Sequence, residues 1–115
     1  MGFGRWLVRK GNVGGTARAV AKGWKAIKQK NPDKNDEEIA QTYLGIRYGA
    51  TGEAHLAKSV LKNLAVNRRQ PNPLNLSWAI FTVENADEAR TVLEHSVEWK
   101  QIMREEIERM GIAAE

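Results

Sequence analysis

Along four stretches of the chain, apolar residues recur every three or four positions, the spacing that places them on one face of an α-helix. The first stretch predicts a helix over residues 16–30, with Thr16 as its N-cap. Pro32 disfavours a helical conformation at Asn31, so this helix should end near Lys30. Its apolar stripe consists of Ala17, Val20, Ala21, Trp24 and Ile27.

The second and third stretches predict two shorter helices, over residues 36–48 and 52–67. Asn35, with Glu38 three positions later, has the pattern of a capping box, in which each side chain bonds the backbone N–H of the other residue. Thr51 is the expected cap of the third helix. The stripe of the second helix consists of Ile39, Tyr43 and Ile46, and that of the third consists of Leu56, Val60, Leu61 and Leu64.

The fourth stretch predicts the longest helix, from Asn85 to Gly111, roughly 37 Å in length. Asn85 and Glu88 repeat the capping-box pattern at its start. Its near-heptad stripe is longer than a core of this size needs, so part of the stripe should stay exposed and available to a partner. The predicted partner-helix face consists of Leu93, Trp99, Met103, Ile107 and Met110.

Two other segments are less regular. Residues 74–84 form a short apolar run that fits a helix capped by Asn75 or a strand, and we favour the helix. Residues 1–15 hold five of the ten glycines, which are costly to order. We therefore predict a mostly α fold: a single domain of four or five helices over residues 16–115, after a flexible, basic, glycine-rich arm over residues 1–15. The alternative is an α+β fold with a two-stranded sheet formed by residues 5–9 and 78–83.

Composition excludes several classes of protein. The 115 residues suit one domain, and the absence of cysteine excludes disulfides, thiolate nucleophiles and cysteine-ligated metal sites. A cysteine-free chain fits a reducing compartment, so we expect a cytoplasmic protein. No apolar run approaches the roughly 20 residues that span a bilayer.

Charge is distributed unevenly along the chain. Residues 1–30 carry eight basic and no acidic side chains, whereas residues 84–115 carry nine acidic and four basic ones. The net charge of +4 therefore conceals a basic N-terminal segment and an acidic C-terminal one. These two segments are expected to pair with each other, within one molecule or across a dimer.

Residues with catalytic or ligand-binding chemistry are few. His95 and Glu98 share a helix face at i, i+3, but two ligands do not make a metal site, and His55 stands apart from them. The glycine-rich stretch over residues 11–16 precedes the first predicted helix, yet it lacks the order of a phosphate-binding loop and is better interpreted as a flexible entry loop. We predict no catalytic residues, no cofactor and no metal.

These features favour a non-catalytic protein-interaction module. It would bind itself as a homodimer, or another protein, through the long C-terminal helix. The alternative is a non-specific nucleic-acid-binding accessory protein, because clustered cations bind phosphates and an aromatic among them can stack on bases. A membrane surface is a less favoured partner of the same segment. The residues that would contact an anion or nucleic acid are Arg5, Trp6, Arg9, Lys10, Arg18, Lys22, Lys25 and Lys28.

Overall fold

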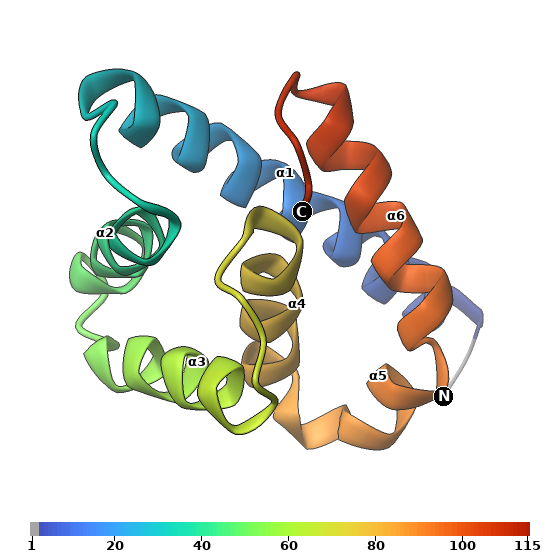
Figure 1. Ribbon diagram of the computed structural model, residues 1–115. Coiled ribbons are helices and arrows are strands. Elements are labelled where there is room, and N and C mark those ends of the chain that lie inside the picture. The colour runs from blue at the N-terminus through green and yellow to red at the C-terminus, as the bar shows by residue number, and fades with distance from the viewer. Residues whose placement is uncertain (1–2) are drawn as a thin grey trace.

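The computed structural model describes residues 3–115, with side chains from Lys10 onward. Over these residues the chain forms six α-helices and one short 3-10 helix, η1, with no strand (Figure 1). The mostly α prediction is confirmed, and the two-stranded alternative is wrong because residues 5–9 and 78–83 are both helical. In chain order the elements are α1 (Phe3–Lys30), α2 (Asp36–Gly49), α3 (Ala54–Val66), α4 (Pro73–Glu84), η1 (Ala86–Glu88), α5 (Ala89–Glu94) and α6 (Ser96–Arg109).

Helix α1 is twice as long as its stripe suggested. It ends at Lys30 as predicted, but it begins at Phe3, so Thr16 lies inside the helix and caps nothing. The prediction of a loosely ordered arm is therefore wrong for residues 3–15. Val13 is fully buried and Gly14 is buried beside α6, so tertiary packing offsets the intrinsic cost of the glycines.

Local sequence signals predicted the position of α2 correctly. The side chain of Asn35 accepts a hydrogen bond from the backbone N–H of Glu38, and Glu38 accepts one from the backbone N–H of Asn35. Three acidic residues in the first turn add favourable charge at the positive end of the helix dipole. The predicted capping box is confirmed, since the two reciprocal bonds depend only on neighbouring residues.

The ends of α3 differ from their prediction. Thr51 does not cap the helix, because its hydroxyl donates to the carbonyl of Tyr48 and Glu53 occupies the N-cap position without a side-chain hydrogen bond. At the other end, the N–H groups of Arg68 and Arg69 return to the carbonyls of Ala65 and Leu64. These two bonds form a Schellman motif, with Arg68 at the left-handed position (φ 51°) that glycine usually occupies.

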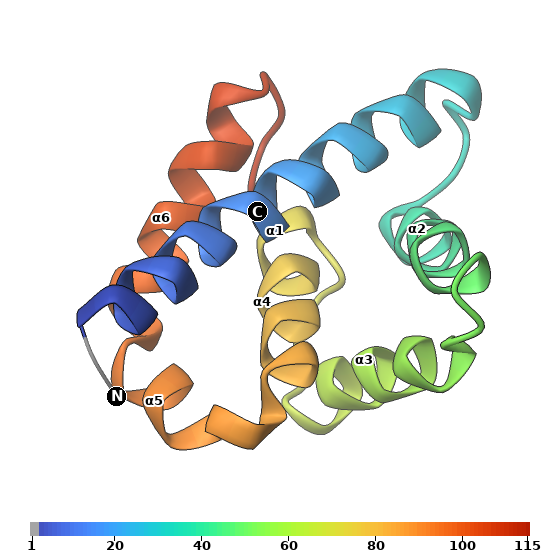
Figure 2. The ribbon, with the colours of Figure 1, turned by 180° about the vertical axis from the view of Figure 1, so that it is seen from behind.

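Helix α4 lies at the centre of the molecule, between α3 and α6 and against α1 (Figures 1 and 2). Its N-cap is Asn72 instead of Asn75: the Asn72 side chain accepts from the Asn75 N–H, and Pro73 occupies the first turn. The helix is apolar on all sides because it is buried on all sides. That pattern explains why periodicity alone left residues 74–84 ambiguous.

The predicted long C-terminal helix is broken into three pieces. Asn85 donates its side-chain amide to the carbonyl of Phe81 and so ends α4, and no side-chain hydrogen bond from Asn85 caps the residues that follow. The chain then turns through η1 and α5 and breaks again at His95 before α6 begins. The prediction of a single helix from Asn85 to Gly111 is therefore wrong. The breaks bring α6 back alongside α1 and α4, where its apolar face is buried.

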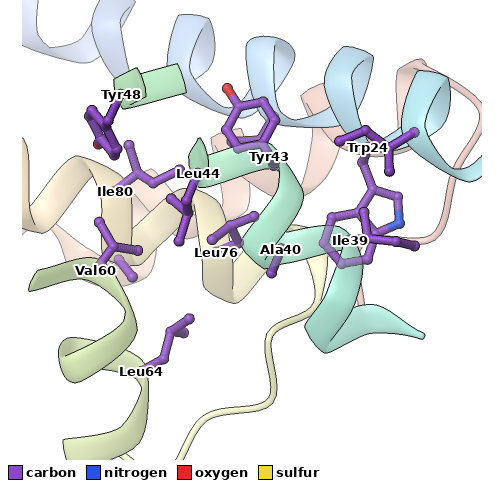
Figure 3. Packing of buried hydrophobic residues seen from close by; sticks show 13 residues of the cluster. Trp24, Ile39, Ala40, Tyr43, Leu44, Tyr48, Val60, Leu64, Leu76 and Ile80 are labelled. Atoms are coloured by element: carbon purple, nitrogen blue, oxygen red, sulfur yellow. The ribbon is translucent and has the colours of Figure 1, made fainter. Parts of the chain in front are cut away.

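Two hydrophobic clusters fill the two sides of α4. One joins the second half of α1 to α2, α3 and one face of α4, and Figure 3 shows its side chains converging between these helices. The other joins the middle of α1, through Val13, Ala17 and Ala21, to the opposite face of α4, to α5 and to α6. Helix α1 runs diagonally across both clusters (Figure 2), so it connects the two halves of the domain.

Candidate functional site

An apolar hollow at the described surface lies between α1 and α2, and we call it the α1–α2 groove. It has a volume of about 340 Å³. Ile46 stands at its side with 64% of its surface exposed, although the sequence pattern had placed this residue in the buried stripe of α2. The groove is lined by Gly23, Ala26, Ile27, Lys30, Asn31, Thr42, Tyr43 and Ile46.

Small and polar neighbours explain why Ile46 stays exposed. Thr42 precedes it by one helical turn and Gly49 follows it by three residues, so Tyr43 is the one large side chain among its neighbours along this face of α2. Across the groove, α1 contributes Gly23, Ala26, Ile27 and Lys30, and the first two have side chains too small to fill the space. The sequence shows no break in the stripe before Ile46, since Tyr43 precedes it by three residues, so its exposure depends on the small α1 residues across the groove.

A hydrogen-bonded network holds α2 against α4 beside the groove. The guanidinium of Arg47 contacts the carboxylate of Glu84 through Nε at 3.0 Å and Nη2 at 3.1 Å. Its remaining nitrogen, Nη1, donates to the hydroxyl of Tyr43 at 2.9 Å. Tyr48 donates a short hydrogen bond to Glu84 Oε2. The Tyr48 phenol and the bidentate ion pair therefore link α2 to a residue 36 or 37 positions later in the chain, and the Tyr43 phenol supports Arg47 within α2.

This network is partly withdrawn from solvent, and its pKa values reflect that. Burial and the hydrogen bond to Glu84 raise the pKa of Tyr48 well above its ordinary value near 10. Burial by itself would lower the pKa of Arg47, but its hydrogen bonds to Glu84 and Tyr43 outweigh burial and raise it. Both residues therefore keep their protons at any physiological pH. The network is a structural support, since neither Tyr48 nor Arg47 exchanges a proton near neutrality.

Most of the predicted partner-helix face belongs to the core. Trp99, Met103 and Ile107 are fully buried within the chain, so their assignment to an exposed partner face is wrong. They pack in the second hydrophobic cluster with Val13, Ala17 and Phe81, because α6 returns against α1 and α4. Met110 is half-buried beside the same cluster. Leu93 is the member that remains exposed, at 70%.

Leu93 has an exposed apolar neighbour in the sequence that our prediction did not include. Val97 is 86% exposed and lies four residues later, on the other side of the break at His95. The acidic residues Glu94 and Glu98 accompany them. We call Leu93 and Val97, with these two acids, the α5–α6 edge. It lies at the end of the molecule opposite α2 (Figure 1).

The acidic helix α6 neutralises part of the basic segment within the same molecule. Lys10 forms an ion pair with Glu98 at 3.5 Å, and Arg18 contacts Glu106 at 3.2 Å. Lys25 donates to the carbonyl of Met110 at 3.2 Å, at the C-terminal end of α6. The expectation that the basic and acidic segments pair within one molecule is confirmed for these contacts.

Other predicted anion contacts are placed differently. Lys28 donates to the carbonyl of Lys34, and Lys22 is exposed on α1. Arg5, Trp6 and Arg9 lie outside the residues whose side chains the structure describes. The glycine-rich stretch over residues 11–16 lies inside α1, so it presents no helix N-terminus to a phosphate and is not an entry loop.

The histidines lie in ordinary structural positions. His95 stacks on Trp99 with the ring centres 4.9 Å apart, and its Nδ1 lies 3.8 Å from Glu98. His55 is exposed on α3. Across the part of the chain that the structure describes, no three His, Asp or Glu side chains gather as metal ligands would. No helix in that part is both long enough and apolar enough to cross a bilayer.

Comparison with known proteins adds no assignment to this geometry. No protein-family model, no curated protein and no solved structure in these comparisons matches the chain. The function is therefore argued from the surfaces described above.

Proposed function

We propose that this chain is a non-catalytic protein-interaction module that holds an amphipathic helix of its partner in the α1–α2 groove. One observation carries the proposal: an apolar groove of about 340 Å³ with the 64% exposed Ile46 at its side. Grooves between two helices bind amphipathic helices through apolar residues spaced by three or four positions. We assign the docking surface to this groove instead of to the apolar stripe of α6, which is buried in the core.

The shape and support of the groove favour this occupant. On its α1 side, Gly23 lets the Tyr43 ring of α2 come close, and the small side chain of Ala26 leaves room for a partner. Tyr43 and Ile46 form the opposite wall and supply apolar contact. Because the Arg47–Glu84 pair anchors α2 through Tyr43, this wall is held in place before a partner arrives, which reduces the entropic cost of binding.

Selection of peptides on the folded protein tests this function. Displayed helical peptides would be selected on the wild type, and the affinity of each selected peptide would be measured by calorimetry on the wild type and on Ile46→Glu. We expect binding to weaken at least roughly tenfold in Ile46→Glu, because the new carboxylate must be desolvated beside apolar side chains. Val66→Glu is the matched control, since Val66 is 71% exposed on α3 and should bind peptide like the wild type.

A selection that yields only peptides indifferent to Ile46→Glu would refute this function. The two variants must first give the same thermal unfolding midpoint as the wild type, which their exposed positions predict.

Nucleic-acid binding through the basic segment is the weaker proposal. Arg18 already has a carboxylate partner, and Lys25 and Lys28 donate to backbone carbonyls, so contact with phosphates would compete with these bonds.

A further inference from the structure

We infer that the outer side of α3, with the loop that follows it and one lysine of α6, binds the phosphate backbone of a nucleic-acid duplex. This surface is separate from the α1–α2 groove and from the basic segment of α1, so the inference goes beyond the proposed function. We call the surface the α3 cationic face, and its members are Lys58, Lys62, Arg68, Arg69 and Lys100.

The α3 cationic face belongs to a segment without acidic residues. Residues 54–83 carry four lysine or arginine side chains and no Asp or Glu. Lys58 and Lys62 are exposed and lie one helical turn apart, on the side of α3 that faces away from the buried Val60 and Leu64. Helix α3 lies at the outside of the molecule, with α2 and α4 on its inner side (Figure 1). Its positive charges therefore point toward solvent.

The cations of this face differ from those of α1 in their partners. Lys10 and Arg18 of α1 pair with carboxylates of α6. Across residues 10–115, by contrast, no ion pair joins a member of the α3 cationic face to a carboxylate. A phosphate backbone could therefore contact these side chains without breaking an ion pair of the folded protein.

Two of the charges act on each other across different elements. The ammonium group of Lys100 lies 5.1 Å from the centre of the Trp78 ring, which holds it beside α4. Burial, together with the positive charge of Arg69, lowers the pKa of Lys100 below its ordinary value. An anion that contacts both cations would relieve their repulsion. Phosphate suits that role because it is charged and accepts several hydrogen bonds.

Arg68 occupies a backbone position where a side chain costs stability. Its φ of 51° lies in the left-handed region, which glycine usually supplies at the end of a helix. Residues held in this conformation cluster at sites that bind ligands, where function offsets the strain. Arg68 is exposed and stands directly before Arg69. We attribute the arginine at this strained position to the charge that it adds to the face.

The composition of the face favours a duplex over other polyanions. A membrane-bound helix inserts an apolar side, but the apolar side of α3 packs against α2 and α4, and Val66 is the large apolar residue left exposed on it. Protein interfaces are depleted in lysine at their centre. Single strands stack their bases on aromatic rings, yet residues 54–72 contain no Phe, Tyr or Trp. A duplex directs its phosphates outward and needs only cations along its path.

Fluorescence anisotropy of a short labelled DNA duplex of mixed sequence tests the inference. We expect the affinity of the wild type to fall steeply as salt rises, because each phosphate contact releases counterions. Replacing both Lys58→Gln and Lys62→Gln should weaken binding at low salt at least roughly tenfold and reduce the salt slope by about 2. The matched control is Lys22→Gln with Lys30→Gln, which removes the same charge from exposed positions of α1 and should weaken binding at most about twofold.

Arg68→Gly separates binding from folding. Glycine relieves the strained backbone, so this variant should be at least as stable as the wild type while binding the duplex several-fold more weakly. Weaker binding by a more stable protein cannot result from unfolding. Unchanged affinity in Arg68→Gly would remove Arg68 from the face and contradict the assignment of its strain to binding.

The remaining outcomes decide between surfaces and between ligands. Undetectable binding of the duplex at low salt overturns the inference. An equal loss of affinity in the α3 and α1 double variants also overturns it, because net charge alone would then explain the binding. Tighter binding of a single strand of the same length, or of vesicles rich in anionic lipid, than of the duplex would assign the face to another polyanion. None of these results bears on the peptide selection at Ile46, which tests the groove.

Discussion

Gly23 of α1 and Tyr43 of α2 approach so closely that a β-carbon on residue 23 would lie 2.5 Å from Cε1 of the tyrosine ring. The ring cannot easily move away, because it is buried and its hydroxyl accepts a hydrogen bond from Arg47. The absence of a side chain at residue 23 thus sets the distance between the two helices that form the groove.

Replacing Gly23 should therefore destabilise the protein. We expect Gly23→Ala to lower the free energy of unfolding by about 1–2 kcal/mol, since the clash outweighs the better helix propensity of alanine. Gly15→Ala is the matched control in the same helix, because nothing lies within 4 Å of its β-carbon position. It should raise stability by roughly 0.5–1 kcal/mol. Urea unfolding measures both changes, and equal effects of the two variants would contradict the close packing.

The ion pair beside the groove gives a second prediction. Glu84→Gln keeps the shape of the side chain but removes the charge that holds Arg47 and Tyr48. Both side chains of the pair are less than a third exposed, so we expect a loss of about 1–3 kcal/mol of unfolding free energy. Arg90→Gln is the control, because Arg90 pairs with Glu94 on the surface and should cost at most about 0.5 kcal/mol.

Stability at alkaline pH should depend on Tyr48. Its pKa is raised in the folded protein, so its contribution is complete below its ordinary pKa near 10 and is lost as pH rises beyond that value. Over that range the unfolded chain releases the phenolic proton while the folded chain keeps it. We expect the stability advantage of the wild type over Tyr48→Phe to be constant from pH 7 to about 9 and to shrink by at most about 1.4 kcal/mol per pH unit above 10. A gap that stays constant to pH 11.5, as measured by urea unfolding, would exclude this coupling.

The left-handed backbone at Arg68 offers a stabilising substitution. A side chain with φ of 51° crowds the following carbonyl, and glycine avoids that strain. Arg68→Gly should raise the unfolding free energy by about 1 kcal/mol, because the Schellman bonds of residues 68 and 69 remain. Lys62→Gly, in the interior of α3, should instead lower it by about 1 kcal/mol.

Removing the charge of Glu106 should increase the affinity of the protein for nucleic acid, because it frees Arg18 of α1. In the wild type, Glu106 accepts from both Arg18 and Arg109, and these bonds, the one from Arg18 above all, lower the pKa of Glu106 below its ordinary value. Glu106→Gln should raise the affinity for duplex DNA several-fold at low salt, with a steeper salt dependence, because Arg18 becomes available to phosphate. Fluorescence anisotropy at two salt concentrations measures both quantities. Unchanged binding would show that the α1–α6 pairing does not limit contact with nucleic acid.

Features that depend on neighbouring residues could be predicted from the sequence alone. The capping box of Asn35 and Glu38, the end of α1 before Pro32 and the stripe of α1 from Ala17 to Ile27 follow from hydrogen bonds and periodicity within a few turns. The uneven charge also indicated that α1 and the C-terminal segment attract each other, as the Arg18–Glu106 contact shows.

Other features of the fold follow from packing between helices that are distant in the sequence. The helical state of residues 3–15 depends on burial of Val13 and Gly14 against distant helices, and local propensity opposes it. The break at His95 interrupts a stripe that reads as continuous, and the turn of the chain there lets Trp99 be buried in the core. Exposure of Ile46 and burial of Met103 were likewise settled by which helices pack together, since periodicity identifies an apolar face but not the neighbour that covers it.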